Sequence, residues 1–248
     1  MLRSTKALAA VSVLLVAAIA SDAFLIHAAR EYFKTTLAIR LDPAGLGAYA
    51  GERGTLPKNE SPLVFFGDSR ALMWKAPDGP MSYRIVNRGV GNQTTAQMLL
   101  RLDADMAELR PSIVVLEGGI NDLKAIPEFP ERRAQIVADC KANLTQIIEA
   151  CRRAGARVVV VTVFEIGHVS LWRQPFWSKE VHEAVGEVNS YLRTLTRDGV
   201  VLFDANPVLT EGKDEVEPAY QVDYLHLSSA GYDALNRQLL PLLRSLPK

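Results

Sequence analysis

Short apolar runs alternate with longer segments of helical periodicity through most of the chain. The apolar runs are bounded by turn residues and are predicted as strands: Leu63–Phe66, Arg84–Asn87, Ile113–Glu117, Arg157–Val163 and Val200–Asp204. The longer segments carry apolar residues three to four positions apart and are predicted as helices: Thr94–Arg110, Ala134–Arg153, Trp177–Arg197 and Ser228–Leu246. Continuous Val and Ile runs fit strands that are buried on both faces, and strand–helix alternation indicates a parallel sheet. We therefore expect an α/β fold, a three-layer α/β/α sandwich.

The N-terminus has a different pattern, because two basic residues precede an Ala-rich apolar run, Ala7–Ala20. This order is typical of a secretory signal, and Ala18-Ile19-Ala20 supplies the small residues that a signal peptidase requires. Apolarity resumes after Asp22, so that Ala7–Ala29 approaches the roughly 20 residues needed to span a bilayer. A cleaved signal peptide and an uncleaved membrane anchor both remain open. Either one predicts export to the periplasm or another extracytoplasmic location.

The rest of the chain divides by composition into two parts. Residues 30–60 are predicted as a juxtamembrane region: an amphipathic helix over Arg30–Asp42, followed by a linker rich in Gly, Pro and charge. The main folded domain is expected over residues 61–248, a length that suits one substantial core.

Charge and cysteine content narrow the functional classes. The chain has 28 Lys and Arg against 28 Asp and Glu, so it lacks the positive field that nucleic-acid binders use, and nucleic acid is not an expected partner. Cys140 and Cys151 fall in one predicted helix, about 16 Å apart along its axis, which excludes a disulfide between them. Neither cysteine belongs to a metal-ligand spacing, and no metal site is expected.

The first motif that can carry chemistry is Gly67-Asp68-Ser69, at the end of the first predicted strand. Open α/β sheets place their ligands at the carboxyl ends of their strands. A serine there can act as a nucleophile, although the motif taken alone favours a helix N-cap.

The second motif, Asp223-Tyr224-Leu225-His226, lies just before the last predicted helix. A serine hydroxyl needs an imidazole to accept its proton and a carboxylate to orient that imidazole. Asp223 and His226 can supply both groups, while the structural alternative is a capping Asp and a packed His.

Two further motifs follow the second and third predicted strands. Asn121 lies in Gly119-Ile120-Asn121-Asp122, where its amide can donate to a developing oxyanion. The Gly-containing segment Asn87–Thr95 includes Gly91 and Asn92 and can aim backbone N–H groups at the same place. Taken singly, each of these two motifs also fits an ordinary turn.

The four motifs in this order resemble the SGNH/GDSL hydrolase family. The family's Gly-Asp-Ser block, glycine-bearing second block, Gly-x-Asn-Asp block and Asp-x-x-His block all have counterparts here, and the resemblance covers about Leu63 to Leu246. It implies the SGNH hydrolase fold, with a flavodoxin-like parallel sheet of about five strands. One departure is Gly91-Asn92-Gln93, because relatives usually read Gly-Gly-Asp or Ser-Gly-Asp and use the later glycine, here Asn92, as a backbone donor to the oxyanion.

The resemblance implies a serine esterase with Ser69 as nucleophile, His226 as general base and Asp223 as the triad acid. The oxyanion hole would be formed by Asn121, Asn92 and Gly91, with the backbone N–H of Ser69. No cofactor is implied, and the partner is a small-molecule, glycan or lipid ester. Two alternatives remain open: an O-acyltransferase with the same triad, and a non-catalytic binding module.

The remaining candidates have structural interpretations. Asp68 is expected to organise the turn around Ser69, and Glu117 is expected to serve the fold. The histidines His27, His168 and His182 lack a carboxylate at useful spacing and are expected to be incidental. The loop Gly167–Trp177 has aromatic side chains that would either line the acyl or leaving-group pocket or pack ordinarily; its relevant members are His168, Trp172, Arg173, Phe176 and Trp177.

Overall fold

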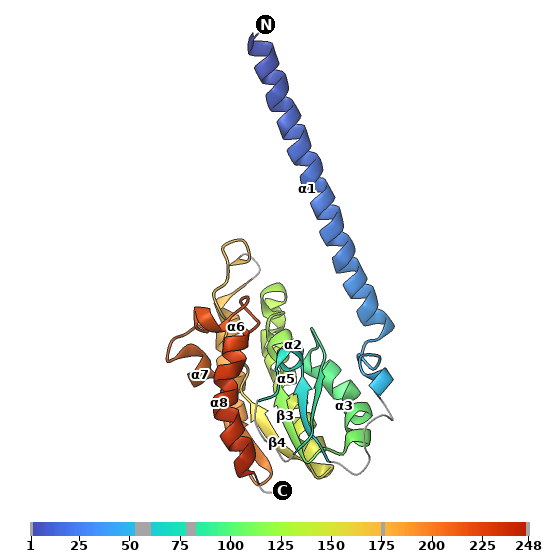
Figure 1. Ribbon diagram of the computed structural model, residues 1–248, viewed down its shortest axis with the longest axis vertical. Coiled ribbons are helices and arrows are strands. Elements are labelled where there is room, and N and C mark those ends of the chain that lie inside the picture. The colour runs from blue at the N-terminus through green and yellow to red at the C-terminus, as the bar shows by residue number, and fades with distance from the viewer. Residues whose placement is uncertain (1, 53–60, 78–82, 175–176, 247–248) are drawn as a thin grey trace. The chain divides into compact units, whose positions relative to one another are not determined.

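The computed structural model describes residues 2–52, 61–77, 83–174 and 177–246 (Figure 1). The helices and strands are, in chain order, α1 (Leu2–Leu41), η1 (Ala50–Glu52), β1 (Leu63–Gly67), α2 (Ser69–Met73), β2 (Ile85–Gly89), α3 (Thr95–Leu109), β3 (Ile113–Glu117), α4 (Ile120–Leu123), η2 (Ile126–Glu128), η3 (Pro130–Arg132), α5 (Arg133–Arg153), β4 (Arg157–Val161), α6 (Lys179–Thr194), β5 (Val200–Phe203), α7 (Asn206–Thr210), η5 (Pro218–Tyr220) and α8 (Ser229–Ser245).

The five strands form one parallel sheet in the order β2-β1-β3-β4-β5. This is the flavodoxin-like order, in which the chain direction across the sheet reverses between β1 and β3. Ligands of such folds bind outside the carboxyl ends of the strands at that switch point. The register pairs Gly67 with Gly89 on one side and with Glu117 on the other, so the ends of β1, β2 and β3 lie at one level.

Alternate side chains of the strands point to opposite faces, and each face has its own apolar core. Val64, Phe66 and Val114 pack with side chains of α3, α5 and α6. Phe65 and Val115 pack on the other face with side chains of α8 and α7 (Figure 1). The helices therefore cover both faces of the sheet, which confirms the predicted three-layer α/β/α fold.

The chain divides into two compact units, Met1–Gly45 and Leu46–Lys248. In the first unit, one continuous helix, α1, contains the apolar run Ala7–Ala20 and extends through the predicted amphipathic segment as far as Leu41. Among the described residues, Val11–Leu41 is long and apolar enough to cross a membrane, and an 18-residue window within it has a mean hydropathy of 2.0. A signal sequence meets the same criterion, so α1 is compatible with a signal peptide or with an anchor.

Several element boundaries differ from the sequence prediction. Strand β4 ends at Val161, two residues early, because the backbone N–H of Val163 donates to the side chain of Asn189 (2.7 Å) outside the sheet. Helix α6 begins at Lys179 and ends at Thr194, whereas the prediction extended it to residues 177 and 197. Helices α2, α4 and α7 were not predicted, since four or five residues carry too little periodicity to detect.

Both cysteines lie in α5 and are free and buried. Burial raises the pKa of Cys140 well above its usual value and that of Cys151 to about 12. Their common position in one continuous helix is the arrangement from which the absence of a disulfide between them was predicted.

Candidate active site

A sharp turn at the end of β1 presents Ser69 as the first residue of α2. The Asp68 side chain caps this helix, because its Oδ1 accepts from the backbone N–H of Arg70 at 2.8 Å. Gly67 is required by close packing, since a Cβ atom there would lie 2.0 Å from the carbonyl oxygen of Glu117. The turn therefore depends on Gly67, the last residue of β1, and on Asp68, which caps α2. Together they place Ser69 at the switch point of the sheet.

The structure brings Ser69, His226 and Asp223 into one hydrogen-bonded chain, although 157 positions separate Ser69 from His226. Ser69 Oγ lies 3.0 Å from His226 Nε2, and His226 Nδ1 lies 2.9 Å from Asp223 Oδ2. A hydroxyl, an imidazole and a carboxylate thus have the relative geometry that a catalytic triad requires.

Asp223 also fixes the backbone around the histidine. Its Oδ1 accepts from the backbone N–H groups of Leu225 (2.7 Å) and His226 (2.8 Å). Partial burial opposes ionisation of Asp223, but the hydrogen bonds from the His226 side chain and from these two N–H groups outweigh it and lower the pKa of the carboxyl. The carboxylate is therefore ionised at neutral pH, as an acceptor for Nδ1–H must be.

Arg70 joins the two halves of this triad, and sequence reasoning missed it. Its side chain is fully buried, Nε donates to the carbonyl of Leu225 at 2.8 Å, and Nη1 donates to the carbonyl of Phe164 at 3.1 Å. The residue next to the nucleophile is thus tied to the residue next to His226. No pattern in the sequence marks this contact, because it joins positions 155 residues apart.

Asn121 lies beside the nucleophile turn in the single-turn helix α4. Its side-chain Nδ2 donates to Asp68 Oδ2 at 3.2 Å and to the carbonyl oxygen of Gln93 at 3.0 Å, and the residue is 6% exposed. The amide therefore bridges the turn that bears Ser69 and the turn that follows β2. Asp122, the next residue, accepts from the backbone and side chain of Thr95 at 2.9 and 2.6 Å, which fixes α4 against the start of α3.

The turn after β2 carries Gly91 and Asn92, both exposed. Asn92 has a φ of 62°, in the left-handed region, whereas Gly91 is not at positive φ. Left-handed backbone favours glycine, and Asn is one of the few other residues that adopt it readily. The turn after β2 therefore adopts a conformation that favours glycine at a position where this chain has asparagine.

A buried carboxyl pair supports the turn from beneath. Glu117 is 1% exposed and Asp68 is completely buried. Burial, together with the charge of Asp68, raises the pKa of Glu117 well above its usual range, and burial also raises the pKa of Asp68. The two side-chain oxygens of Asp68 accept from the backbone N–H of Arg70 and from the side chain of Asn121.

The loop Gly167–Trp177 packs on the segment that carries Asp223 and His226. The Trp177 ring stands edge-on to Tyr224, with centroids 5.2 Å apart, and Arg173 Nη1 donates to the Tyr224 hydroxyl at 3.1 Å. Trp172 is 68% exposed, and the Arg173 guanidinium lies over its ring. Phe176 lies outside the described residues.

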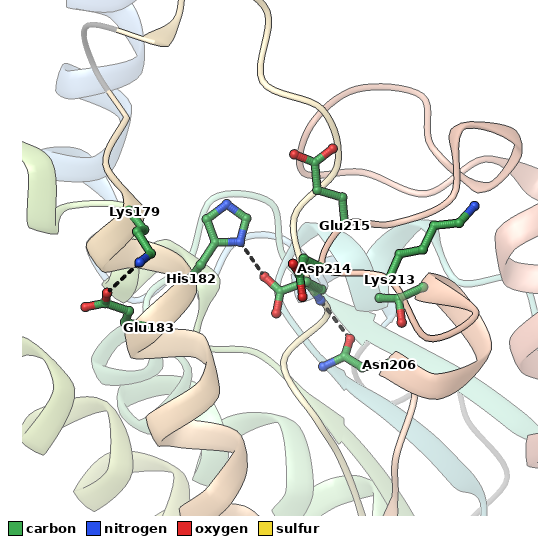
Figure 2. Close-up of a pocket in the computed structure, with 9 residues that line it drawn as sticks. Lys179, His182, Glu183, Asn206, Lys213, Asp214 and Glu215 are labelled. Carbon is green, nitrogen blue, oxygen red and sulfur yellow. Dashed lines mark hydrogen bonds and ion pairs between the residues drawn. The ribbon is translucent and has the colours of Figure 1, made fainter.

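His182 corrects the sequence analysis, because it does have a carboxylate partner. Its Nδ1 lies 2.8 Å from Glu165 Oε1, 17 positions away, and this hydrogen bond raises the pKa of His182. The pair lines an open pocket of about 550 Å³ (Figure 2) together with Lys179, Glu183, Asn206, Thr210, Lys213, Asp214 and Glu215. His168 lies 4.0 Å from Glu215, a contact between two exposed side chains. His27 lies in α1 and in the other unit.

No group of three or more His, Cys, Asp or Glu side chains within the described parts of the chain is arranged to hold a metal ion. The side chains that the structure brings together here offer a hydroxyl, an imidazole, a carboxylate and an amide donor.

Comparison with known proteins agrees with this geometry. The profile of the GDSL-like lipase/acylhydrolase family matches residues 65–234, which include Ser69, Asn121, Asp223 and His226. The chain belongs to this family. The assignment confirms the resemblance that the four sequence motifs indicated.

Among individual relatives, esterase TesA of Pseudomonas aeruginosa is 26% identical over 175 residues, which cover 71% of this chain and 77% of the relative. The human platelet-activating factor acetylhydrolase IB subunit alpha1 is 29% identical over 195 residues, covering 75% and 77% of the two chains. A GDSL-like lipase from Bacteroides thetaiotaomicron has a similar fold, with a TM-score of 0.62, 19% identity, and coverage of 81% of this chain and 98% of that one.

Membership in this GDSL-like family identifies the chain as an enzyme of the carboxylic ester hydrolase class, as the sequence predicted. The SGNH-type fold is confirmed by the sheet order and by the structural likeness.

Proposed function

We propose that this GDSL-like hydrolase is a serine esterase in which Ser69, His226 and Asp223 form the catalytic triad. The observation that carries the proposal is the continuous hydrogen-bond chain from Ser69 Oγ through the His226 ring to Asp223, with contacts of 3.0 and 2.9 Å. A nucleophile, its base and the group that orients the base are the minimum that acyl transfer through an acyl-enzyme requires.

In the first step, His226 Nε2 accepts the hydroxyl proton while Ser69 Oγ forms a bond to the ester carbonyl carbon. The carbonyl oxygen becomes the oxyanion of a tetrahedral intermediate, and the ionised Asp223 stabilises the imidazolium. The intermediate collapses by breaking its bond to the alcohol oxygen, which takes the proton from His226. The products of this step are the free alcohol and an acyl ester of Ser69.

In the second step, His226 removes a proton from water as the water oxygen attacks the acyl-Ser69 carbonyl. The second intermediate collapses by breaking its bond to Ser69 Oγ, to which His226 returns the proton. The carboxylic acid leaves, and the enzyme returns to its starting protonation state. No cofactor takes part in these steps.

The oxyanion hole in this proposal consists of the Asn121 side chain and the backbone N–H groups of Ser69 and Asn92, with Gly91 shaping the turn. Asn121 Nδ2 already lies next to the Ser69 turn, and its longer hydrogen bond, to Asp68, is the one that it can exchange for the oxyanion. The positive φ of Asn92 supports the carry-over of a backbone donor from the family's second block, because glycine, the usual residue there, can adopt this conformation freely.

For the substrate we propose a small-molecule, glycan or lipid ester that is met outside the cytoplasm. The relatives include an esterase and a platelet-activating factor acetylhydrolase, and a similar fold occurs in an acetyl xylan esterase with a TM-score of 0.56. The apolar helix α1 supports export, either as a signal peptide or as a tether.

The test is Ser69→Ala, assayed with nitrophenyl esters of increasing acyl length and with a fluorophosphonate probe. We expect turnover to fall by at least about 10⁴-fold and labelling to disappear, with the melting temperature unchanged. Ser112→Ala is the matched control, because Ser112 lies at the opposite end of the sheet and hydrogen-bonds only to the backbone of Ser61 through its side chain.

Undiminished turnover in Ser69→Ala would refute the mechanism. Absence of both hydrolysis and labelling in the unmodified chain would favour a non-catalytic binding module. Transfer of the acyl group to an added polyol, in place of water, would identify an O-acyltransferase with the same triad.

A further inference from the structure

The segment that follows the first unit packs against the catalytic sheet. Leu46–Glu52, including the short helix η1, had been expected to belong to a linker, but it belongs to the same compact unit as the sheet. It lies against β2, the edge strand that leads into the turn with Gly91 and Asn92. The contacts are made by Tyr49 and Glu52.

The charge of Arg88 explains why this segment is needed. Arg88 lies on an edge strand, and yet it is 3% exposed. Its Nη1 pairs with Glu52 at 2.7 Å, and its guanidinium lies over the Tyr49 ring, 4.4 Å from the centroid. A buried charge is costly unless it is paired, so removal of this segment would leave Arg88 without its carboxylate and its aromatic cover.

Tyr49 also reaches the backbone at the start of the oxyanion turn. Its hydroxyl donates to the carbonyl oxygen of Gly89 at 2.5 Å. The N–H of the same residue donates to Asn87 Oδ1 at 2.8 Å, and the N–H of Val90 donates to the carbonyl of Gly67 at 3.0 Å. Gly89 is thus held through both of its polar groups, and its carbonyl is held by a side chain from outside the sheet.

The other end of the turn is held as firmly. The carbonyl oxygen of Gln93 accepts from Asn121 at 3.0 Å, and its side-chain oxygen accepts from Arg101 Nε at 2.5 Å. Arg101 in turn donates to the carbonyl of Gly67 at 2.8 Å. Between these two fixed ends lie only the exposed residues Gly91 and Asn92, together with Val90.

We propose that Tyr49 is a positioning residue for ester hydrolysis: its hydrogen bond to the Gly89 carbonyl sets the orientation of the turn whose Asn92 N–H enters the oxyanion hole. This inference rests on the proposed function, because it presumes that Asn92 donates to the oxyanion. It makes the segment between α1 and the sheet a working part of the active site, and a chain that begins after Tyr49 would have a complete triad but an unsupported oxyanion turn.

The test is Tyr49→Phe in the full chain, which removes one hydroxyl and keeps the ring over Arg88. A misplaced donor weakens the transition state and leaves the ground state nearly unchanged, so we expect kcat on a soluble nitrophenyl ester to fall by about tenfold and KM to change by less than about twofold. The rate of fluorophosphonate labelling at Ser69 should fall in proportion, because phosphonylation uses the same oxyanion hole.

Tyr191→Phe is the matched control. Its hydroxyl makes a hydrogen bond of 2.7 Å to Thr145 Oγ1 between α6 and α5, away from the strand ends that bear the site. We expect a similar loss of melting temperature in both variants and a loss of kcat in Tyr49→Phe alone. A purely structural role of Tyr49 would lower both melting temperatures and neither kcat.

Ser69→Ala measured in parallel separates the two proposals. If Ser69→Ala is inactive but the kcat of Tyr49→Phe stays within twofold of that of the unmodified enzyme, the role of Tyr49 is refuted and the triad stands. If Ser69→Ala is active, the triad itself is refuted. If Tyr49→Phe does not fold, Glu52→Gln provides the second test, because it loosens Arg88 and keeps the Tyr49 hydroxyl. A two- to threefold loss of kcat at constant KM, in the range expected for a slightly displaced donor, then supports the inference, and an unchanged kcat refutes it.

Discussion

The left-handed conformation of Asn92 leads to a graded prediction about catalysis. Its φ of 62° is reached without strain by glycine, tolerated by asparagine, disfavoured for alanine and most disfavoured for valine, which is β-branched. If the backbone N–H of Asn92 donates to the oxyanion, kcat should follow that conformational preference and should be insensitive to the polarity of the side chain. We therefore expect the kcat of Asn92→Gly to equal or exceed that of the unmodified enzyme. The kcat of Asn92→Ala should be lower, and that of Asn92→Val lower still.

The magnitude follows from the cost of the conformation. Holding a residue other than glycine in the left-handed conformation costs about 1–2 kcal/mol. If the turn instead relaxes to negative φ and withdraws its N–H from the oxyanion, a loss of that size in transition-state stabilisation lowers the rate by about 5- to 30-fold. Asn121→Ala should cost more, about 10²–10³ in kcat, because it deletes a donor outright. It also removes the hydrogen bond that holds the Gln93 carbonyl at 3.0 Å.

Steady-state kinetics on a soluble nitrophenyl ester measure this series, with melting temperatures as the check on folding. Arg110→Val is the control, because Arg110 has a φ of 41° at the C-terminal end of α3 and lies away from the strand ends that bear the site. It should lose stability and keep its kcat. A kcat for Asn92→Gly as low as that of Asn121→Ala would show that the Asn92 side chain acts directly, and an unchanged kcat in Asn92→Val would remove Asn92 from the oxyanion hole.

Three further predictions concern the triad, the second histidine and export. Asp223→Asn should lower kcat by about 10⁴-fold, because the amide cannot hold the Nδ1–H tautomer of His226, and a loss below about tenfold would contradict the triad. The hydrogen bond from Glu165 raises the pKa of His182 above its ordinary 6.5, so protonated His182 stabilises the native state below about pH 6.5 and this contribution is lost as the pH rises through the higher native pKa. The melting-temperature difference between the unmodified enzyme and Glu165→Gln should therefore shrink from about pH 5 to about pH 9, and an equal difference at both pH values would exclude the linkage. Cell fractionation should find the protein outside the cytoplasm, with intact-mass analysis deciding between cleavage after Ala20 and retention of α1; a soluble cytoplasmic protein that keeps Met1 would refute both.

Features encoded by local patterns could be predicted from the sequence. The run Ile113–Glu117 is apolar and continuous because both of its faces are covered, and its predicted bounds match β3. The motif residues could also be found, because chemistry at the end of a parallel strand needs particular residue types directly after the strand. Their spatial meeting followed from topology, since parallel strands end at one edge of the sheet.

Contacts between distant segments could not be predicted, because they leave no periodic signal. Glu165 and His182 meet only because the loop after β4 turns back over the start of α6. Tyr49 lay in a segment rich in Gly and charge that is typical of a linker, and its partner is a backbone carbonyl, which every residue possesses. Arg70 resembled an ordinary helix residue, although it is completely buried.

Two buried arginines, Arg70 and Arg101, show how such distant contacts stiffen the site. Arg101 donates to the carbonyl of Gly67 at 2.8 Å, just before the nucleophile turn, and Arg70 donates to the carbonyl of Leu225 at 2.8 Å, just before the base. A guanidinium cannot lose its charge in a protein, so neither side chain can move away from these oxygens without leaving a buried cation poorly paired. The positions of the proposed nucleophile and the proposed base therefore depend on buried cations that are costly to displace. These charges would hold the proposed triad in place without taking part in the reaction.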